Sequence, residues 1–177
     1  MNSSTAATMP HGPPPSPELY CAGPLWEQLI LSLRERGHHG KRESGAFLLG
    51  QRIDGRARIA EFILYDDLDP HSLDRGIVHF DGRYYGALWD RCRRTGRIVV
   101  ADVHTHPYGA RQSSSDRAHP MIATAGHIAL IIPDFALQPP PLRTIGMYRY
   151  LGAQRWYTVP RAQRGAFLQI EPRGVSA

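Results

Sequence analysis

The segment Val103–Pro107, with the sequence VHTHP, constrains this chain more than any other stretch. It closes a run of apolar residues that starts at Ile98 and is typical of a buried strand. Alternate residues of a strand point to the same face, so His104 and His106 are predicted to project together. Pro107 lacks an amide N–H and is expected to end the strand. The sequence therefore predicts two imidazoles at a strand end, placed to chelate one metal ion.

A third ligand is available in Asp116, a short loop beyond the histidines. Zinc hydrolases use three protein ligands and leave one position for a water molecule, whose pKa the metal lowers toward neutrality. A further carboxylate must take a proton from that water, and Glu43, at the start of an apolar strand, is the candidate. Two histidines and a carboxylate also describe the site of non-haem iron oxygenases. Glu43 and the serines that precede Asp116 favour hydrolysis.

Asp102 lies on the same predicted strand face as His104. It could accept a hydrogen bond from an imidazole N–H, or it could be buried elsewhere with a backbone partner. Three other histidines have no comparable context and are expected to be structural: His79, His119 and His127.

Helical and strand signals mix along the chain without strict alternation. Apolar residues at helical spacing predict a first helix that ends near Gly37, and Asp54-Gly55 between two apolar runs predicts a hairpin. The other expected elements are helices over 81–96 and 115–125, strands over 98–106 and 129–132, and a C-terminal hairpin of residues 144–150 and 154–159. The mixture indicates an α+β fold or a three-layer α/β/α variant.

One domain is expected over residues 18–160, with a flexible Pro-rich leader over 1–17 and a C-terminal tail over 161–177. The two cysteines form no recognised pairing motif, which favours a reducing cytoplasm. No apolar run approaches the ~20 residues that span a bilayer, and the N-terminal residues lack the pattern of a signal peptide. We expect a soluble cytoplasmic protein without a membrane partner.

The formal net charge of +5 raises the question of nucleic-acid binding, because a basic surface attracts phosphate. The arginines are scattered over several predicted elements and form no basic stripe. A specific nucleic-acid partner is therefore not expected.

Taken together, these residues resemble the JAMM, or MPN-plus, metalloproteases, and among them the deubiquitinase-like bacterial JAB-domain peptidases. The resemblance covers roughly Leu25 to Pro160, and the loop Tyr108–Gln112 is one residue shorter than in most family members. The family pattern is a distant Glu, then His-Ser/Thr-His-Pro, then a Ser and an Asp separated by two residues, which read here as Glu43, His104–Pro107, Ser113 and Asp116.

The resemblance implies a mixed β-sheet of the MPN/JAB type flanked by helices, with cytidine-deaminase-like layering. It also implies a bound Zn2+ whose ligands are His104, His106 and Asp116. Glu43 would be the general base and then the general acid, and Ser113 would donate a hydrogen bond to the developing oxyanion. Ser114 or Ser115 could take this last role instead.

The implied activity is that of a zinc isopeptidase or peptidase that cleaves after the C-terminal tail of a ubiquitin-like protein, in deconjugation or in precursor processing. Its partners would be the ubiquitin-like protein or its conjugates, with E1- or E2-like proteins of the conjugation pathway. Two other classes stay open: a non-catalytic MPN-type binding module and a nucleic-acid-associated protein of the RadC type. The presence of the full ligand set together with Glu43 favours the enzyme.

Overall fold

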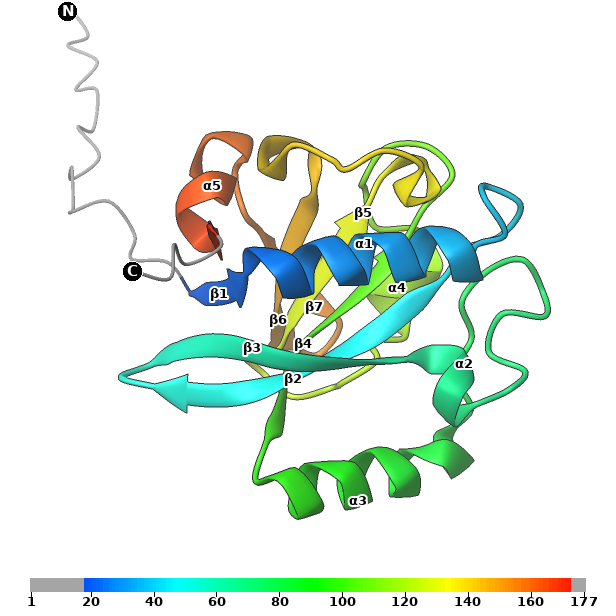
Figure 1. Ribbon diagram of the computed structural model, residues 1–177, viewed down its shortest axis with the longest axis horizontal. Coiled ribbons are helices and arrows are strands. Elements are labelled where there is room, and N and C mark those ends of the chain that lie inside the picture. Colours follow the sequence, from blue (N-terminus) through cyan, green and yellow to red (C-terminus); the bar gives the residue numbers. More distant parts are fainter. Residues whose placement is uncertain (1–17, 173–177) are drawn as a thin grey trace, which may run out of the picture.

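An eight-stranded mixed β-sheet forms the centre of the computed structural model, which describes residues 18–172 (Figure 1). The strand order is β7-β6-β5-β4-β2-β3-β1-β8. The strands are β1 Leu19–Ala22, β2 Gly45–Ile53, β3 Arg56–Leu64, β4 Ile98–Thr105, β5 Ile128–Ile132, β6 Gly146–Gly152, β7 Arg155–Thr158 and β8 Leu168–Glu171. The α-helices are α1 Gly23–Arg36, α2 Tyr65–Leu68, α3 Tyr85–Thr95, α4 Ser114–Ala118 and α5 Arg164–Phe167. The expected α+β class is confirmed, and the predicted leader over 1–17 lies outside the described residues.

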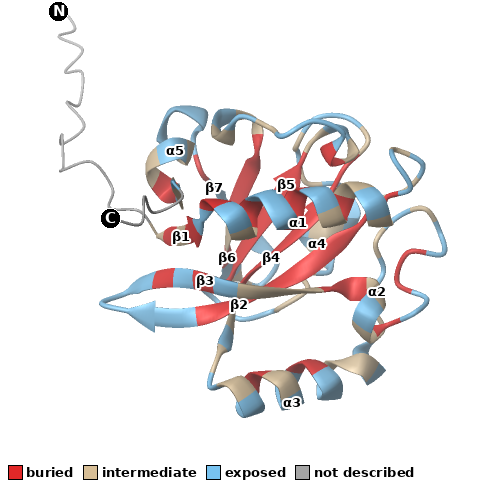
Figure 2. Ribbon diagram, viewed as in Figure 1, coloured by how far each residue is buried: buried red, intermediate tan, exposed pale blue. Residues whose placement is uncertain are grey.

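Helices cover both faces of the sheet. Helix α1 contributes Leu29 and Leu33 to a core that includes Leu48 of β2. Helix α3 contributes Leu88 to a second core, which includes Phe47, the preceding residue of β2. Neighbouring residues of a strand point to opposite faces, so the two helices lie on opposite sides of the sheet (Figures 1 and 2). None of the described helices is long and apolar enough to cross a membrane.

Local sequence signals set several element ends as predicted. Helix α1 has Pro24 in its first turn and ends at Gly37. Asp54 and Gly55 have φ angles of 51° and 77°, and two positive φ angles are the backbone of the type I′ turn that joins hairpin strands. Gly96 has a φ of 65° and ends α3 in the left-handed conformation.

Two regions differ from the prediction. The helix expected over 115–125 is the five-residue α4, because Pro120 disfavours helical backbone in the residue before it. Residues 161–172, expected to belong to a tail, contribute α5 and β8 to the domain. Strand β8 pairs in parallel with β1, with Leu19 opposite Leu168. Each of these strands has only four residues, so the pairing was not apparent from the local pattern.

The pairing of β2 with β4 decides which way the predicted histidines point. The two strands are antiparallel, with Gly45 opposite His104 and Phe47 opposite Asp102. Because Phe47 belongs to the core under α3, Asp102 and His104 face the same side of the sheet as that helix. His106 follows two residues later and shares this face.

Gly45 is packed so closely that a side chain does not fit. A Cβ atom there would lie 2.3 Å from Cε2 of Tyr65 and 2.8 Å from the carbonyl oxygen of Val103, and Tyr65 is fully buried. We expect Gly45→Ala to lower the free energy of unfolding, measured in urea, by about 3 kcal/mol through overpacking. The control is Gly86→Ala on α3, where a Cβ meets no atom within 4 Å and replacement should be neutral or mildly stabilising. Equal losses in the two variants would contradict the packing argument.

Candidate metal centre

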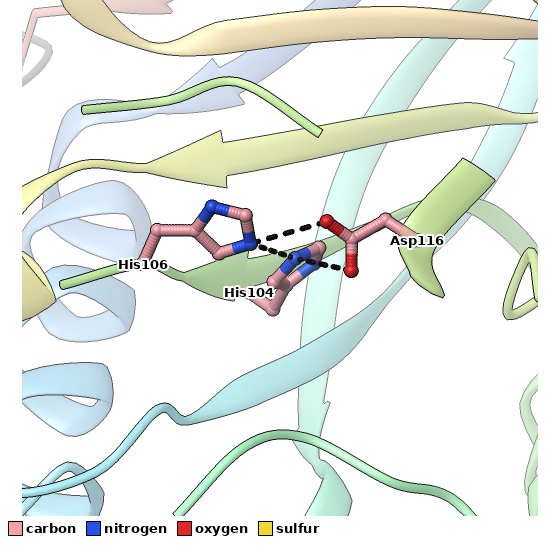
Figure 3. Close-up of side chains that lie close together, drawn as sticks. All are labelled: His104, His106 and Asp116. Carbon is pink, nitrogen blue, oxygen red and sulfur yellow. Dashed lines mark hydrogen bonds and ion pairs between the residues drawn. The ribbon is translucent and has the colours of Figure 1, made fainter. Parts of the chain in front are cut away.

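The three predicted metal ligands converge at the end of β4 (Figure 3). The two Nε2 atoms of His104 and His106 are 3.0 Å apart. The Asp116 carboxylate lies 3.5 Å from His104 Nε2 through Oδ1 and 3.2 Å from His106 Nε2 through Oδ2. A tetrahedral zinc with bonds of 2.0–2.1 Å has ligand atoms about 3.3 Å apart, so the spacing and the donor set fit this ion. The three residues therefore form a candidate metal site.

Access to this site differs between its ligands. The side chains of His104 and His106 are 8% and 10% exposed, whereas that of Asp116 is 21% exposed. The backbone on both sides positions the histidines, because His104 pairs with β2 and β5 and the His106 N–H donates to the Ile132 carbonyl at 2.9 Å. The centre is thus embedded in the sheet on the histidine side and open to solvent on the Asp116 side.

A capping box at the start of α4 positions Asp116. The Ser113 hydroxyl oxygen accepts a hydrogen bond from the Asp116 N–H at 3.1 Å, and Asp116 Oδ2 accepts one from the Ser113 N–H at 2.6 Å. Ser113 therefore helps to orient a metal ligand, a role that the sequence prediction did not include. Its hydroxyl is an acceptor in this contact, so its own proton remains free for donation, and the predicted oxyanion role stays a prediction.

Two of the candidate ligands, Asp116 and His104, have pKa values that are shifted in opposite directions. Burial alone would raise the pKa of Asp116, but hydrogen bonds from His104 and His106 hold it well below its usual range. Burial alone would lower the pKa of His104, but the hydrogen bond and the charge of Asp116 raise it above its usual value. When no metal ion is bound, these two shifts favour the ionised form of Asp116 and the protonated form of His104.

Zinc affinity is expected to fall steeply on acidification. The metal needs the Nε2 lone pair of His104, and a raised pKa means that protons compete for it at a higher pH than for an ordinary histidine. The affinity should be full above this pKa and be lost as the pH falls through it, measured by competition with a chromophoric chelator from about pH 8 to about pH 5. A pH-independent affinity over that range would exclude imidazole ligation.

Glu43, the predicted general base, lies beside the centre just before β2. The ladder continues past Gly45 and His104, since the Thr105 N–H donates to the Ser44 carbonyl at 2.8 Å. The Glu43 carboxylate reaches Val78, which packs against the core under α3, so it lies on the face of the sheet that carries the metal ligands. Its carboxylate is held by one backbone contact, in which Oε2 accepts from the Val78 N–H at 3.1 Å. The negative charge of Glu43 also contributes to the raised pKa of His104.

Asp102 has partners that the sequence did not indicate. Its Oδ1 lies 2.5 Å from His127 Nε2, and its Oδ2 accepts a hydrogen bond from the Tyr65 hydroxyl at 3.3 Å. An imidazole partner was one of the two predicted alternatives, but it belongs to His127 and not to one of the candidate metal ligands. His104 Nδ1 is buried and has no hydrogen-bond partner among the described residues. His127 lies just before β5, which runs parallel to β4, and only this strand pairing brings it to Asp102.

Fold and site together define an α+β protein with a candidate His-His-Asp metal centre. The chain is a distant homologue of the "Probable metalloprotease y4jG" of Sinorhizobium fredii (strain NBRC 101917 / NGR234), with 27% identity over 133 residues, which cover 75% of this chain and 80% of that protein. No family model matches the chain. The solution structure of protein DSY2949 from Desulfitobacterium hafniense has a TM-score of 0.60 at 14% identity and covers 89% of this chain and 97% of that one. The similarity to protein DSY2949 shows a shared fold and nothing more.

Proposed function

We propose that this chain is a zinc-dependent peptidase of the JAMM type that cleaves after the C-terminal tail of a ubiquitin-like protein. The observation that carries the proposal is the convergence of His104, His106 and Asp116, with ligand atoms 3.0–3.5 Å apart and Glu43 on the same face of the sheet. The relationship to a protein named as a probable metalloprotease supports peptide hydrolysis. The motif resemblance supports the choice of a ubiquitin-like substrate, of E1- or E2-like partners and of a cytoplasmic location.

Each residue of the site has a role in this mechanism. His104, His106 and Asp116 would hold the ion, which when bound polarises the scissile carbonyl and makes water acidic. The Glu43 carboxylate would take a proton from the attacking water and return it to the leaving amine. Its Oε2 is engaged by the backbone of Val78, and its Oε1 has no hydrogen-bond partner among the described residues, so it is available for this proton.

The Ser113 hydroxyl would stabilise the developing oxyanion by donating its proton while it accepts the Asp116 N–H. This dual use is chemically consistent, because a hydroxyl has one donor and two acceptor positions. Removal of such a donor typically lowers kcat by a factor of about 100 or more.

The proposal is tested by cleavage of a ubiquitin-like protein fused through its C-terminal tail to a reporter. We expect zinc near one ion per chain, cleavage after the tail, loss of cleavage on treatment with a chelator, and recovery when zinc is added back. Zinc-loaded protein that binds ubiquitin-like proteins but cleaves none of a panel of them would instead identify a non-catalytic binding module.

A further inference from the structure

A buried polar network lies beside the candidate metal centre, on the same face of the sheet. It consists of Tyr65 at the start of α2, Asp102 of β4 and His127 just before β5. Tyr65 is fully buried, and the side chains of Asp102 and His127 are each 3% exposed. A buried carboxylate is costly even when it is paired and hydrogen-bonded, and the proposed mechanism gives Asp102 no task. A role for this carboxylate must therefore offset the cost of burying it.

The network reaches the side of His104. Asp102 precedes this histidine by two residues, and its side chain points to the same face of β4. Gly45 of β2 lies opposite His104, and a Cβ atom on Gly45 would lie 2.3 Å from Cε2 of Tyr65. The Tyr65 ring thus fills the space beside the histidine that a side chain on β2 would otherwise occupy. Burial alone would lower the pKa of His104, but Asp116 raises it above its usual value and the charge of Asp102 adds to the rise.

Three carboxylates face this side of the sheet without a basic partner, and they belong to Glu43, Asp102 and Asp116. Among the described residues, none of the three contacts an arginine or lysine, although the chain contains 21 such residues. Of these carboxylates, only Asp116 is a candidate ligand. A zinc ion held by one carboxylate and two neutral imidazoles keeps a net positive charge. Asp102 and Glu43 are placed to offset that charge.

We infer that Asp102 raises the affinity of the metal centre for zinc through its charge, without touching the ion. The inference rests on the zinc site of the proposed function and does not depend on the substrate. The Tyr65 hydroxyl and a neutral His127 with its proton on Nε2 can both donate to the carboxylate, so the network as a whole keeps a negative charge. Because the network is buried, water and salt screen this charge little.

The dissociation constant of zinc tests this inference, measured at about pH 9 by competition with a chromophoric chelator. We expect Asp102→Asn to bind zinc about ten- to hundredfold more weakly, the usual loss when a residue behind the ligands is changed. The amide keeps the shape of the carboxylate, with an oxygen that accepts from Tyr65 and an N–H that can donate to His127, so the fold should persist. At this pH protons compete little for the histidines, so the loss reports the charge of residue 102.

Two variants that keep the charge of Asp102 are the controls. Tyr65→Phe removes only a hydroxyl from the network. Glu61→Gln removes a carboxylate whose side chain is 16% exposed and which pairs with Arg91 and Arg97, opposite Leu49 on β2 and away from the metal centre. Both proteins should bind zinc with wild-type affinity, and circular dichroism shows whether each is folded.

A second variant covers the case in which Asp102→Asn does not fold. Asp102→Leu combined with His127→Leu replaces the buried polar pair by apolar side chains, a change that is often neutral or stabilising. This double variant lacks the same charge, and we expect it to fold and to show a similar loss of zinc affinity.

The outcomes separate the effect of this charge from the proposed function. Wild-type zinc affinity in Asp102→Asn or in the double variant would overturn the inference. An equal loss in Tyr65→Phe or Glu61→Gln would also overturn it, because these variants retain the Asp102 charge. Weaker zinc binding by Asp102→Asn alone, in a protein that cleaves no ubiquitin-like substrate, would support the inference and contradict the peptidase proposal. A wild-type protein that binds no zinc would overturn both.

Discussion

The His104→Ala variant is expected to purify without zinc and to show no measurable peptidase activity. His104 Nε2 is one of the three candidate ligand atoms, and it lies 3.0 Å from His106 Nε2. Alanine leaves two protein ligands, and zinc in proteins is almost always held by at least three. Zinc content measured by mass spectrometry and cleavage of the reporter fusion should therefore fall together.

A second histidine variant, His71→Ala, serves as the control that distinguishes loss of a metal ligand from a general effect of removing an imidazole. The side chain of His71 is 76% exposed, is paired with Asp74 and lies outside the metal centre, so His71→Ala should keep both the zinc and the activity. A His104→Ala protein that is folded and still binds zinc at the wild-type ratio would contradict the assigned ligand set. Circular dichroism of both variants shows whether the fold is intact.

The Glu43→Gln variant is expected to retain zinc and lose turnover by a factor of about 10² to 10⁴, the usual contribution of a positioned general acid or base. The amide has nearly the shape of the carboxylate, and its oxygen can still accept the hydrogen bond from the Val78 N–H, so the local structure should persist. The amide of the glutamine cannot take up a proton from water near neutral pH. The predicted signature is a fall in kcat, measured under saturating substrate, with zinc content unchanged.

Glu35→Gln is the control for this substitution. Glu35 is exposed on α1, and α1 covers the face of the sheet opposite to the metal centre. The control should retain wild-type kcat and stability. Normal turnover in Glu43→Gln would rule out Glu43 as the general base. Loss of zinc from this variant would instead indicate that Glu43 helps to hold the metal ion.

Sequence patterns near the histidines predicted a large part of the site. Period-two alternation correctly placed His104 and His106 on one face of β4, and the spacing to Asp116 correctly indicated a third candidate ligand. Ser113 was predicted to be catalytic from the resemblance, and the capping of α4 by its hydroxyl, which orients Asp116, was not predicted. The serine at the start of such a turn and the carboxylate three residues later form a capping-box pattern, so this signal was available.

The fold was predictable where local signals dominate. The Asp54-Gly55 turn, the end of α1 at Gly37 and the end of α3 at Gly96 depend on backbone preferences of the residues themselves. The parallel pairing of β1 with β8 was not predictable in this way, because it joins two four-residue segments from opposite ends of the chain. A bulge in β4 opposite Leu48 and Leu49 likewise depends on the partner strand.

The sequence by itself determined the chemistry that this protein can offer, namely two imidazoles on one strand face and a carboxylate within a short loop. It could do so because the alternation of side chains along a strand follows from covalent geometry. Only the tertiary structure decided that the Val78 N–H holds the Glu43 carboxylate and that Asp102 pairs with His127. These relations depend on strand register and on packing between distant segments, and no short stretch of sequence specifies them.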